Sequence, residues 1–380
     1  MLISRSDRGA LARWWFTIDR PLLSTVLLLM AMGVLISMAA SPPVAERIGL
    51  DSFHFIKSQL FFILIGVITL FAMSFLDPAN IRRTGLVTFG LALLLMLAAL
   101  KFGPEIKGAH RWINLGPLNL QPSEIAKPGF VIYAAWFLSD HVRRPDMPGP
   151  YIAGAGAAVF LCLLVLQPDF GQTALVTLTF GAMLLVFGIP WIVVGGLAAL
   201  TGAAMAASYV LVPHVASRID RFLNPTSGDT FQADTAIEAF NNGGLLGTGP
   251  GGGIAKLVLP DAHTDYTMAV VGEEFGFIAC VALMLVFFFI IIRVLIRAKA
   301  EADPFAALAM TGLAAMFGLQ ACINMGVNVA LLPSKGMTLP FISYGGSSLI
   351  GTALAMGFIL ALARKRAAAS PAKQSGLALA

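Results

Sequence analysis

Charged side chains are scarce in this sequence. Lys, Arg, Asp and Glu together make up 12% of the 380 residues, whereas hydrophobic residues make up 58%. Because a soluble domain carries about 25% charged residues, this composition excludes an ordinary soluble enzyme and predicts an integral membrane protein. The net charge of +5 does not predict a nucleic-acid partner, since the basic residues stand in short clusters between apolar stretches.

Cysteine is also rare. Cys162, Cys280 and Cys322 all lie inside apolar stretches, and their spacing is not that of metal ligands. This excludes a disulfide framework and a cysteine-based metal site. The first apolar stretch follows Arg13 and Arg20, but it is longer than the roughly 7–15 residues of a signal-peptide core, so we interpret it as a membrane anchor.

What the sequence does contain is a series of long apolar stretches. A membrane-spanning helix needs roughly 20 apolar residues, and stretches of this kind, some of them short, lie at 21–40, 54–75, 84–102, 123–138, 150–167, 173–189, 190–212, 267–297, 305–332 and 345–364. They predict an all-α polytopic membrane protein of about ten transmembrane helices. A large extracytoplasmic loop, 213–266, is expected between helices 7 and 8. At Pro190, two helices or a single kinked helix would both fit.

The distribution of Lys and Arg predicts the orientation. Clusters such as those at 82–83 and 143–144 fall on the same side as both termini if the number of helices is even, which places that side in the cytoplasm. A transmembrane domain, 21–366, then lies between a cytoplasmic N-terminal segment, 1–20, and a cytoplasmic tail, 367–380, whose composition predicts disorder. The extracytoplasmic side receives the loops of unusual sequence, so we expect the functional site there.

Several polar side chains lie inside the predicted spans, where they are costly and therefore candidates for function. Glu124 and Lys127 are three residues apart, so on a helix they share a face and can form either a structural ion pair or part of a site. Gln320, Asn324 and Asn328 recur at intervals of four residues, which predicts a polar stripe on one helix face. Interhelical hydrogen bonding explains such a stripe, and substrate contact is the alternative.

Glu273 and Glu274 stand next to each other inside an apolar run. Adjacent helical residues point about 100° apart, so we expect the two carboxylates to face different partners. One would line an outward-facing cavity, and the other would pack against a neighbouring helix. The flanking Gly272 and Gly276 would permit that close packing.

The long loop contains a glycine-rich run at 243–253. Successive backbone N–H groups can form an anion-binding nest, but no Walker A sequence follows, and we interpret the glycines as a flexible loop. Cations are stronger candidates, because Arg218, Arg221, Lys256 and Lys335 stand on a cation-poor side. Charge-assisted hydrogen bonds to phosphate favour Arg and Lys, so these residues predict a phosphate or pyrophosphate ligand, with scattered solvated charge as the alternative.

Asp265 lies where this loop meets the next apolar run. As an N-cap residue it would satisfy free backbone N–H groups of a helix. A carboxylate at a water–membrane boundary beside phosphate-binding cations would also suit a general base. Spacing alone leaves both interpretations open.

A set of motifs in this sequence resembles the SEDS polymerases (shape, elongation, division, sporulation) of bacterial peptidoglycan synthesis. The motifs are KGAHRWI, QPSEIAKP, QPDFGQ, RFLNP, LPDAHTDY with GEEFG, and NMGVN followed by LLPSKGMTLPFISYGGSS. The resemblance extends from about Trp14 to Arg366. The features most similar to the division branch of the family, rather than its elongation branch, are Gly247, Gly249, Gly251 and Lys256, and the pair Lys335 and Gly336.

The resemblance implies a ten-helix fold that polymerises lipid II, a disaccharide-pentapeptide on undecaprenyl pyrophosphate, by inverting glycosyl transfer. The reaction would take place at the outer face of the bacterial cytoplasmic (inner) membrane during cell division. Asp265, the acid of the HTD motif, becomes the expected catalytic residue, which favours the general base over the N-cap. The residues expected to bind or surround the substrate are Lys107, Arg111, Glu124, Lys127, Arg218, Arg221, Lys256, His263, Lys335 and Ser343.

The expected partners are a class B penicillin-binding protein transpeptidase and other divisome proteins. No metal-ligating residues are expected. No cofactor is certain, but a divalent cation, Mg2+ or Mn2+, would be able to share the task of offsetting the pyrophosphate charge. A lipid II flippase is an alternative, against which the sequence offers two arguments: the polar residues gather on one face, and no paired discontinuous segments stand out. An elongation-type polymerase is the other alternative.

Overall fold

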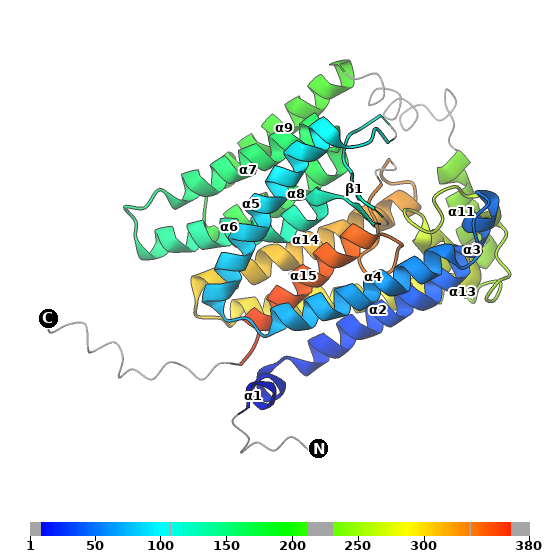
Figure 1. Ribbon diagram of the computed structural model, residues 1–380, viewed down its shortest axis with the longest axis horizontal. Helices are drawn as coiled ribbons and strands as arrows, with labels where there is room; N and C mark the ends of the chain where they lie inside the picture. The colour runs from blue at the N-terminus through cyan, green and yellow to red at the C-terminus, as the bar shows by residue number, and fades with distance from the viewer. Residues whose placement is uncertain (1–8, 107, 117, 212–230, 334–335, 366–380) are drawn as a thin grey trace, which may run out of the picture.

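The computed structural model of the chain describes residues 9–106, 108–116, 118–211, 231–333 and 336–365. These residues form a bundle of long helices (Figure 1). The long helices are α2 (Arg20–Ala40), α4 (His54–Ser74), α5 (Pro78–Phe102), α6 (Pro122–Arg143), α7 (Gly149–Leu166), α8 (Phe170–Phe187), α9 (Trp191–Leu211), α13 (Thr267–Lys299), α14 (Pro304–Asn328) and α15 (Gly346–Leu362). The short elements are α1 (Ala10–Thr17), α3 (Pro42–Arg47), β1 (Ile113–Leu115), β2 (Leu118–Leu120), α11 (Phe231–Gly243) and α12 (Ala255–Val258).

Local sequence explains where several helices begin. Asp19, Asp77, Asp169 and Asp303 occupy the N-cap positions of α2, α5, α8 and α14, and each accepts a hydrogen bond from a backbone N–H of the first turn. Proline follows within two residues at α2, α5 and α14, where its missing N–H removes no helical hydrogen bond. These ends are therefore set by neighbours in the chain.

Every predicted apolar stretch corresponds to one of the long helices, which confirms the all-α polytopic class. By length and composition, seven of the described helices are able to cross a membrane: α2, α4, α5, α7, α8, α13 and α14. The number of ten spans stays a prediction. Because α8 ends at Phe187 and α9 begins at Trp191, Pro190 separates two helices and the single kinked helix is excluded.

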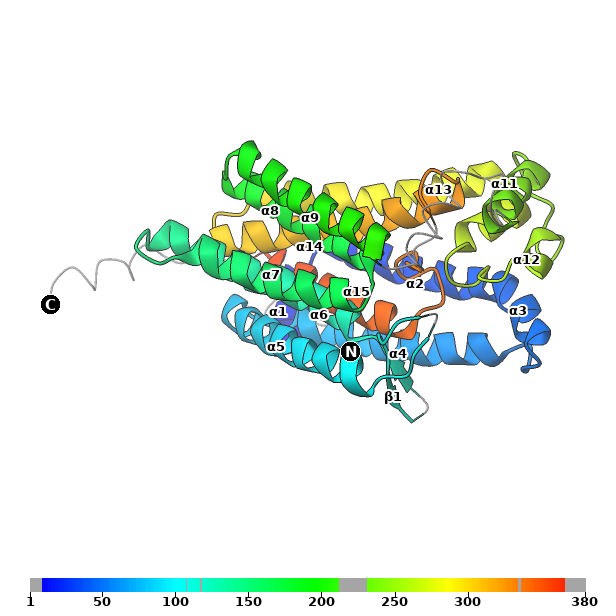
Figure 2. The same cartoon turned by 90° about the horizontal axis from the view of Figure 1, so that it is seen from above.

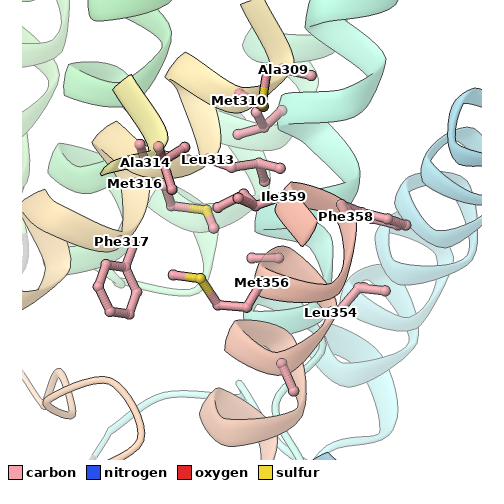
Figure 3. Packing of buried hydrophobic residues seen from close by; sticks show 14 of the residues in the cluster. Ala309, Met310, Leu313, Ala314, Met316, Phe317, Leu354, Met356, Phe358 and Ile359 are labelled. Atoms are coloured by element: carbon pink, nitrogen blue, oxygen red, sulfur yellow. The ribbon is translucent and has the colours of Figure 1, made fainter. Parts of the chain in front are cut away.

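The centre of the bundle is α15, which is almost wholly buried and packs against α2, α4, α5, α6 and α14. Met316 and Phe317 of α14 lie close to Met356 of α15 in the core (Figure 3). Glycine permits a close approach of α15 to α6, since a Cβ at Gly351 would lie 2.4 Å from the carbonyl oxygen of Glu124. Small residues at such contacts let helix backbones pack tightly within a membrane.

The two ends of the bundle differ in structure. The helix α1 and the last turn of α15 lie at one end, whereas α3, α11 and α12 lie at the other (Figures 1 and 2). The hairpin formed by β1 and β2 pairs Ile113 with Leu120 in an antiparallel register. Of the predicted loop 213–266, residues 231–266 are described and carry α11, α12 and Asp265. The predicted tail, 367–380, lies outside the described residues.

Candidate functional site

Asp265 lies in a turn that ends directly before α13. The turn is closed by the backbone amides of Thr264, Asp265 and Tyr266, which all donate to the carbonyl oxygen of Asp261. The N-cap position of α13 falls at Tyr266, so the N-cap interpretation of Asp265 is wrong. The side chain of Asp265 is half-buried, and it faces the loop after α14, because a Cβ at Gly336 would lie 3.9 Å from its Oδ2.

Two asparagines of α14 hold this turn in place. The side-chain amide nitrogens of Asn324 and Asn328 donate to the carbonyl oxygen of Asp265 at 3.0 and 2.8 Å. Asn328 Oδ1 accepts from the Ala269 amide at 2.9 Å, and Asn324 Nδ2 also donates to the Met337 carbonyl at 2.7 Å. Both side chains are fully buried, so the position of Asp265 is set by α14. The predicted hydrogen-bonding role of the stripe is confirmed.

The same stripe reaches the predicted ion pair on α6. Lys127 Nζ lies 2.9 Å from Glu124 Oε2, and both residues are buried. Lys127 Nζ also donates to Gln320 Oε1 at 2.9 Å. Glu124 Oε1 accepts from the side-chain nitrogen Nε2 of Gln172 at 2.5 Å. Gln320 Nε2 donates to the carbonyl of Thr338 at 3.1 Å. A buried polar network therefore links α6, α8 and α14 with the loop that faces Asp265.

Arg111 binds the QPDFG segment between α7 and α8. Its guanidinium donates to the carbonyl oxygens of Gln167, at 2.8 Å, and of Pro168, and it lies 3.7 Å from Asp169 Oδ2. Burial raises the pKa of Asp169, and the charge of Arg111 partly opposes this rise. Gln121 Nε2 donates to the same carboxylate at 3.2 Å. In this conformation Arg111 is largely occupied by protein groups.

Glu273 and Glu274 bind the same segment of chain, so the expectation of different partners is wrong. Glu273 Oε1 accepts from the amides of Ile254 and Ala255 at 2.9 and 3.0 Å. Glu274 accepts from the Gly251 amide at 3.1 Å, and it borders a groove of about 490 Å³ beside α2. The physical reason is that the segment between α11 and α12 lies across this part of α13, where it meets both carboxylates.

These contacts show which groups the glycine-rich run and Lys256 bind in the structure. One amide of the run, that of Gly251, donates to the Glu274 carboxylate, and the amides of Ile254 and Ala255, directly after the run, donate to the Glu273 carboxylate. Lys256 is buried and its ammonium forms an ion pair with Glu274. The ammonium is therefore occupied in this conformation, and the substrate-binding role of Lys256 stays a prediction.

Ser343 belongs to the loop that follows α14, and His263 lies against the same loop, since its carbonyl oxygen accepts from the Tyr344 amide at 2.8 Å. The imidazole of His263 is buried and packs against Phe55 and Tyr344, with ring centroids 4.4 and 5.5 Å apart. Ser343 is also buried, and its hydroxyl accepts from the Leu339 amide at 3.1 Å. In this conformation Ser343 stabilises a turn, and its predicted contact with substrate is not tested.

Four predicted cations, Lys107, Arg218, Arg221 and Lys335, lie outside the described residues, and their roles stay predictions. Within the described part of the chain, no group of three His, Cys, Asp or Glu side chains is able to hold a metal ion. The expected role of Mg2+ or Mn2+ stays a prediction.

Arg47 is a contributor that the sequence did not reveal. From α3 its two terminal nitrogens donate to four consecutive carbonyl oxygens, at 3.5 Å to Leu257, 3.0 Å to Val258, 3.2 Å to Leu259 and 3.0 Å to Pro260. These residues lead directly into the turn of Asp265. The available signal was that Arg47 is a cation on the cation-poor side, but its partners are more than two hundred residues away in the chain.

The fold and the site define a polytopic helical membrane protein with an acidic residue, Asp265, whose backbone is fixed at one end of the bundle. The family model described as cell cycle protein, covering FtsW, RodA and SpoVE, matches residues 20–368. The chain belongs to this family.

Curated relatives and solved structures agree with this membership. A probable peptidoglycan glycosyltransferase FtsW of Caulobacter vibrioides is 41% identical over 96% of this chain and 93% of its own length. One of the same description from Halorhodospira halophila is 35% identical, over 93% of each chain.

Among solved structures, a chain described under the structural coordination of polymerization and crosslinking by a peptidoglycan synthase complex has a TM-score of 0.76. It is 29% identical, over 92% of this chain and 98% of that chain. The rod shape determining protein RodA of Thermus thermophilus has a TM-score of 0.68 at 27% identity, over 92% of this chain and 97% of that chain.

Proposed function

We propose that this protein is a peptidoglycan glycosyltransferase that polymerises lipid II during cell division. The observation that carries the proposal is the position of Asp265, a half-buried acidic residue whose backbone carbonyl is held at one end of a membrane-spanning bundle by two buried asparagines. The names of the curated relatives supply the reaction class and the division branch. The alternative of an elongation-type enzyme rests on the RodA structure, which is less similar in sequence.

In the proposed reaction Asp265 acts as a general base. The oxygen of the acceptor's GlcNAc 4-hydroxyl forms a bond to the anomeric carbon of the donor's MurNAc. The bond from that carbon to the pyrophosphate oxygen breaks with inversion, and undecaprenyl pyrophosphate leaves with the electron pair. The hydroxyl proton passes to the carboxylate of Asp265, a step worth about 10²–10⁴-fold in rate.

Fixed positive charge would assist the leaving pyrophosphate, because positioned cations stabilise charge that develops in the transition state. Lys107, Arg111, Arg218, Arg221, Lys256 and Lys335 are the proposed cations. Among those that the structure describes, Arg111 is partly exposed and Lys256 is buried. Both would have to exchange protein partners for the substrate: Lys256 its ion pair with Glu274, and Arg111 its hydrogen bonds to the carbonyl oxygens of Gln167 and Pro168.

The proposed site faces the extracytoplasmic side of the inner membrane, with both termini in the cytoplasm. The distribution of Lys and Arg supports this orientation. A class B penicillin-binding protein is the proposed partner, together with other divisome proteins, and the similarity to a chain of a peptidoglycan synthase complex supports a partner of this kind.

The test replaces Asp265 with Asn in the purified full-length protein and measures glycan polymers formed from lipid II in detergent. We expect polymerisation to fall by about 10²–10⁴-fold, with unchanged membrane insertion and thermal unfolding. Glu238→Gln is the matched control, since Glu238 is an exposed carboxylate on α11 in the same loop, and it should retain wild-type activity.

Two outcomes would contradict the proposal. Normal polymerisation by Asp265→Asn would exclude this carboxylate from the chemistry. Absence of polymer with the wild-type protein would favour a lipid II transporter, because detergent contains no second compartment and a pure transporter would form no polymer there.

A further inference from the structure

The segment 243–258, which connects α11 through α12 to the turn of Asp265, exposes several large apolar side chains. The exposed fractions are 68% for Leu245, 80% for Leu246, 67% for Ile254 and 53% for Leu257. Single exposed apolar residues are ordinary, but a group of them marks a surface that contacts a membrane or a protein.

The contacts of this segment with α13 indicate its level relative to the membrane. The helix is interrupted at Gly276, where the Phe277 amide donates to the Gly244 carbonyl at 2.9 Å and the Ile278 amide to the Leu245 carbonyl at 3.3 Å. The remainder of α13, from Phe277 onward, rises about 34 Å at 1.5 Å per residue. A hydrocarbon core is about 30 Å thick, so a bilayer spanned by this part of α13 would begin near the level of Leu245.

The helix α2 indicates the same membrane depth for this segment, independently of α13. Leu35 and Met38, in the last two turns of α2, line the groove of about 490 Å³ together with Pro250 and Leu257. Both α2 side chains are more than half exposed, as expected for the lipid-facing side of a spanning helix. Part of the segment therefore stands at the level of the apolar end of α2.

Much of the backbone of the segment is hydrogen-bonded to protein groups, as this location requires. Non-helical backbone is tolerated at membrane depth only where its polar groups are satisfied by protein. The amides that donate to protein acceptors are those of Gly244, Gly247, Thr248, Gly249, Gly251, Gly252, Ile254, Ala255 and Leu257. Carbonyl or carboxylate oxygens of Glu273 and Glu274 accept most of these hydrogen bonds, and the charge of Lys256 is neutralised by Glu274.

We propose that the segment 243–258 is seated in the membrane, with Leu245, Leu246, Ile254 and Leu257 in contact with the acyl chains of the adjacent leaflet. Glu273 and Glu274 make this possible by binding the amides of the segment. The turn of Asp265 is then held next to the lipid headgroups, where the phosphates of a lipid-linked substrate lie. The proposal depends on α13 crossing the membrane and not on the reaction assigned to Asp265.

The experiment measures lipid contact by fluorescence quenching in vesicles. Cys162, Cys280 and Cys322 are replaced by Ala, and single cysteines are introduced as Leu246→Cys, Leu285→Cys and Glu238→Cys. Each full-length variant is labelled with the environment-sensitive fluorophore NBD. It is then reconstituted in phosphatidylethanolamine–phosphatidylglycerol vesicles with a lipid whose spin label lies just below the headgroup.

Leu285 is an exposed residue in the middle of α13, and Glu238 is an exposed polar residue of α11. They serve as the lipid and water references. We expect the label at position 246 to be quenched several-fold more strongly than the label at 238, with an emission maximum close to that at 285. Ile254→Cys should give the same result, and it replaces Leu246→Cys if that variant does not fold.

Equal quenching of the labels at 246 and 238, with emission typical of water, would overturn the proposal. A label at 246 that is shielded from both water and lipid would overturn it as well, and would instead indicate a contact between copies of the protein. Loss of activity in Asp265→Asn affects neither readout, so the two proposals fail separately.

Discussion

Asn324 and Asn328 lie one turn apart on α14, and both donate to a single acceptor, the carbonyl oxygen of Asp265. A buried polar group is expensive unless it is hydrogen-bonded. Loss of either hydrogen bond would leave a buried amide unsatisfied. The two hydrogen bonds therefore restrict the backbone of Asp265 to one position. Asp265 as a whole is half-buried.

Asn328→Leu should reduce both stability and activity. The substitution removes one donor to Asp265 and the acceptor of the Ala269 amide, and buried groups left without partners cost about 1–3 kcal/mol each. We expect a lower unfolding temperature in detergent and slower polymerisation of lipid II. Asn242→Leu, an exposed change at the end of α11, should alter stability by less than about 0.5 kcal/mol. Equal effects of the two changes would refute the anchoring role of Asn328.

At the scale of elements, α13 is a spanning helix with a separate N-terminal piece, residues 267–275. Gly276 has a φ of 80°, a conformation that favours glycine. This break turns the amides of Phe277 and Ile278 toward the segment 243–258. The same break separates the residues that carry the carboxylates from the apolar part of the helix.

Gly276→Ala tests the importance of this break. Alanine at a positive φ costs more than about 1 kcal/mol, and its Cβ would lie 2.4 Å from the backbone of Gly247 and of Leu245. We expect a clear loss of unfolding free energy. Gly90→Ala on α5 is the control, because a Cβ there meets nothing within 4 Å, and it should stabilise the helix by about 0.5–1 kcal/mol. A neutral Gly276→Ala would mean that the break is not required.

At the scale of the whole molecule, Asp19 connects the start of α2 with the far end of α13. Its carboxylate is buried and lies 3.2 Å from Arg293 Nη2 and 2.7 Å from Arg297 Nη2. Desolvation by burial raises the pKa of Asp19, but hydrogen bonds from Arg293, the Leu22 amide and Arg297 outweigh it. The pKa is therefore held below its ordinary value.

This depressed pKa predicts a pH dependence of stability. The stabilising contribution of Asp19 is fully present above its unfolded pKa of about 3.9. It is lost as the pH falls through the lower folded pKa. Asp19→Asn should thus lower the unfolding temperature near pH 7, and its difference from wild type should shrink below about pH 4. Asp51→Asn, which removes an exposed ion pair with Lys57, should change little at any pH. A difference that persists unchanged in acid would contradict the ionic connection.

Much of the fold could be predicted from the sequence, because an apolar run of about 20 residues has few stable solutions other than a membrane helix. Local spacing also predicted the pairing of Glu124 with Lys127, since residues three apart on a helix share a face. Asp265 was found through the resemblance of its motif, whereas spacing left two interpretations open.

Only the tertiary structure decided which distant groups meet. Glu273 and Glu274 bind amides that lie about twenty residues earlier in the chain, and Arg47 binds carbonyls more than two hundred residues later. Neither pairing follows from helical periodicity, because each depends on how separate elements pack. The sequence by itself determined that the chain forms membrane helices and which polar groups they carry. Packing determined which of these groups became occupied and left the carboxylate of Asp265 half-buried.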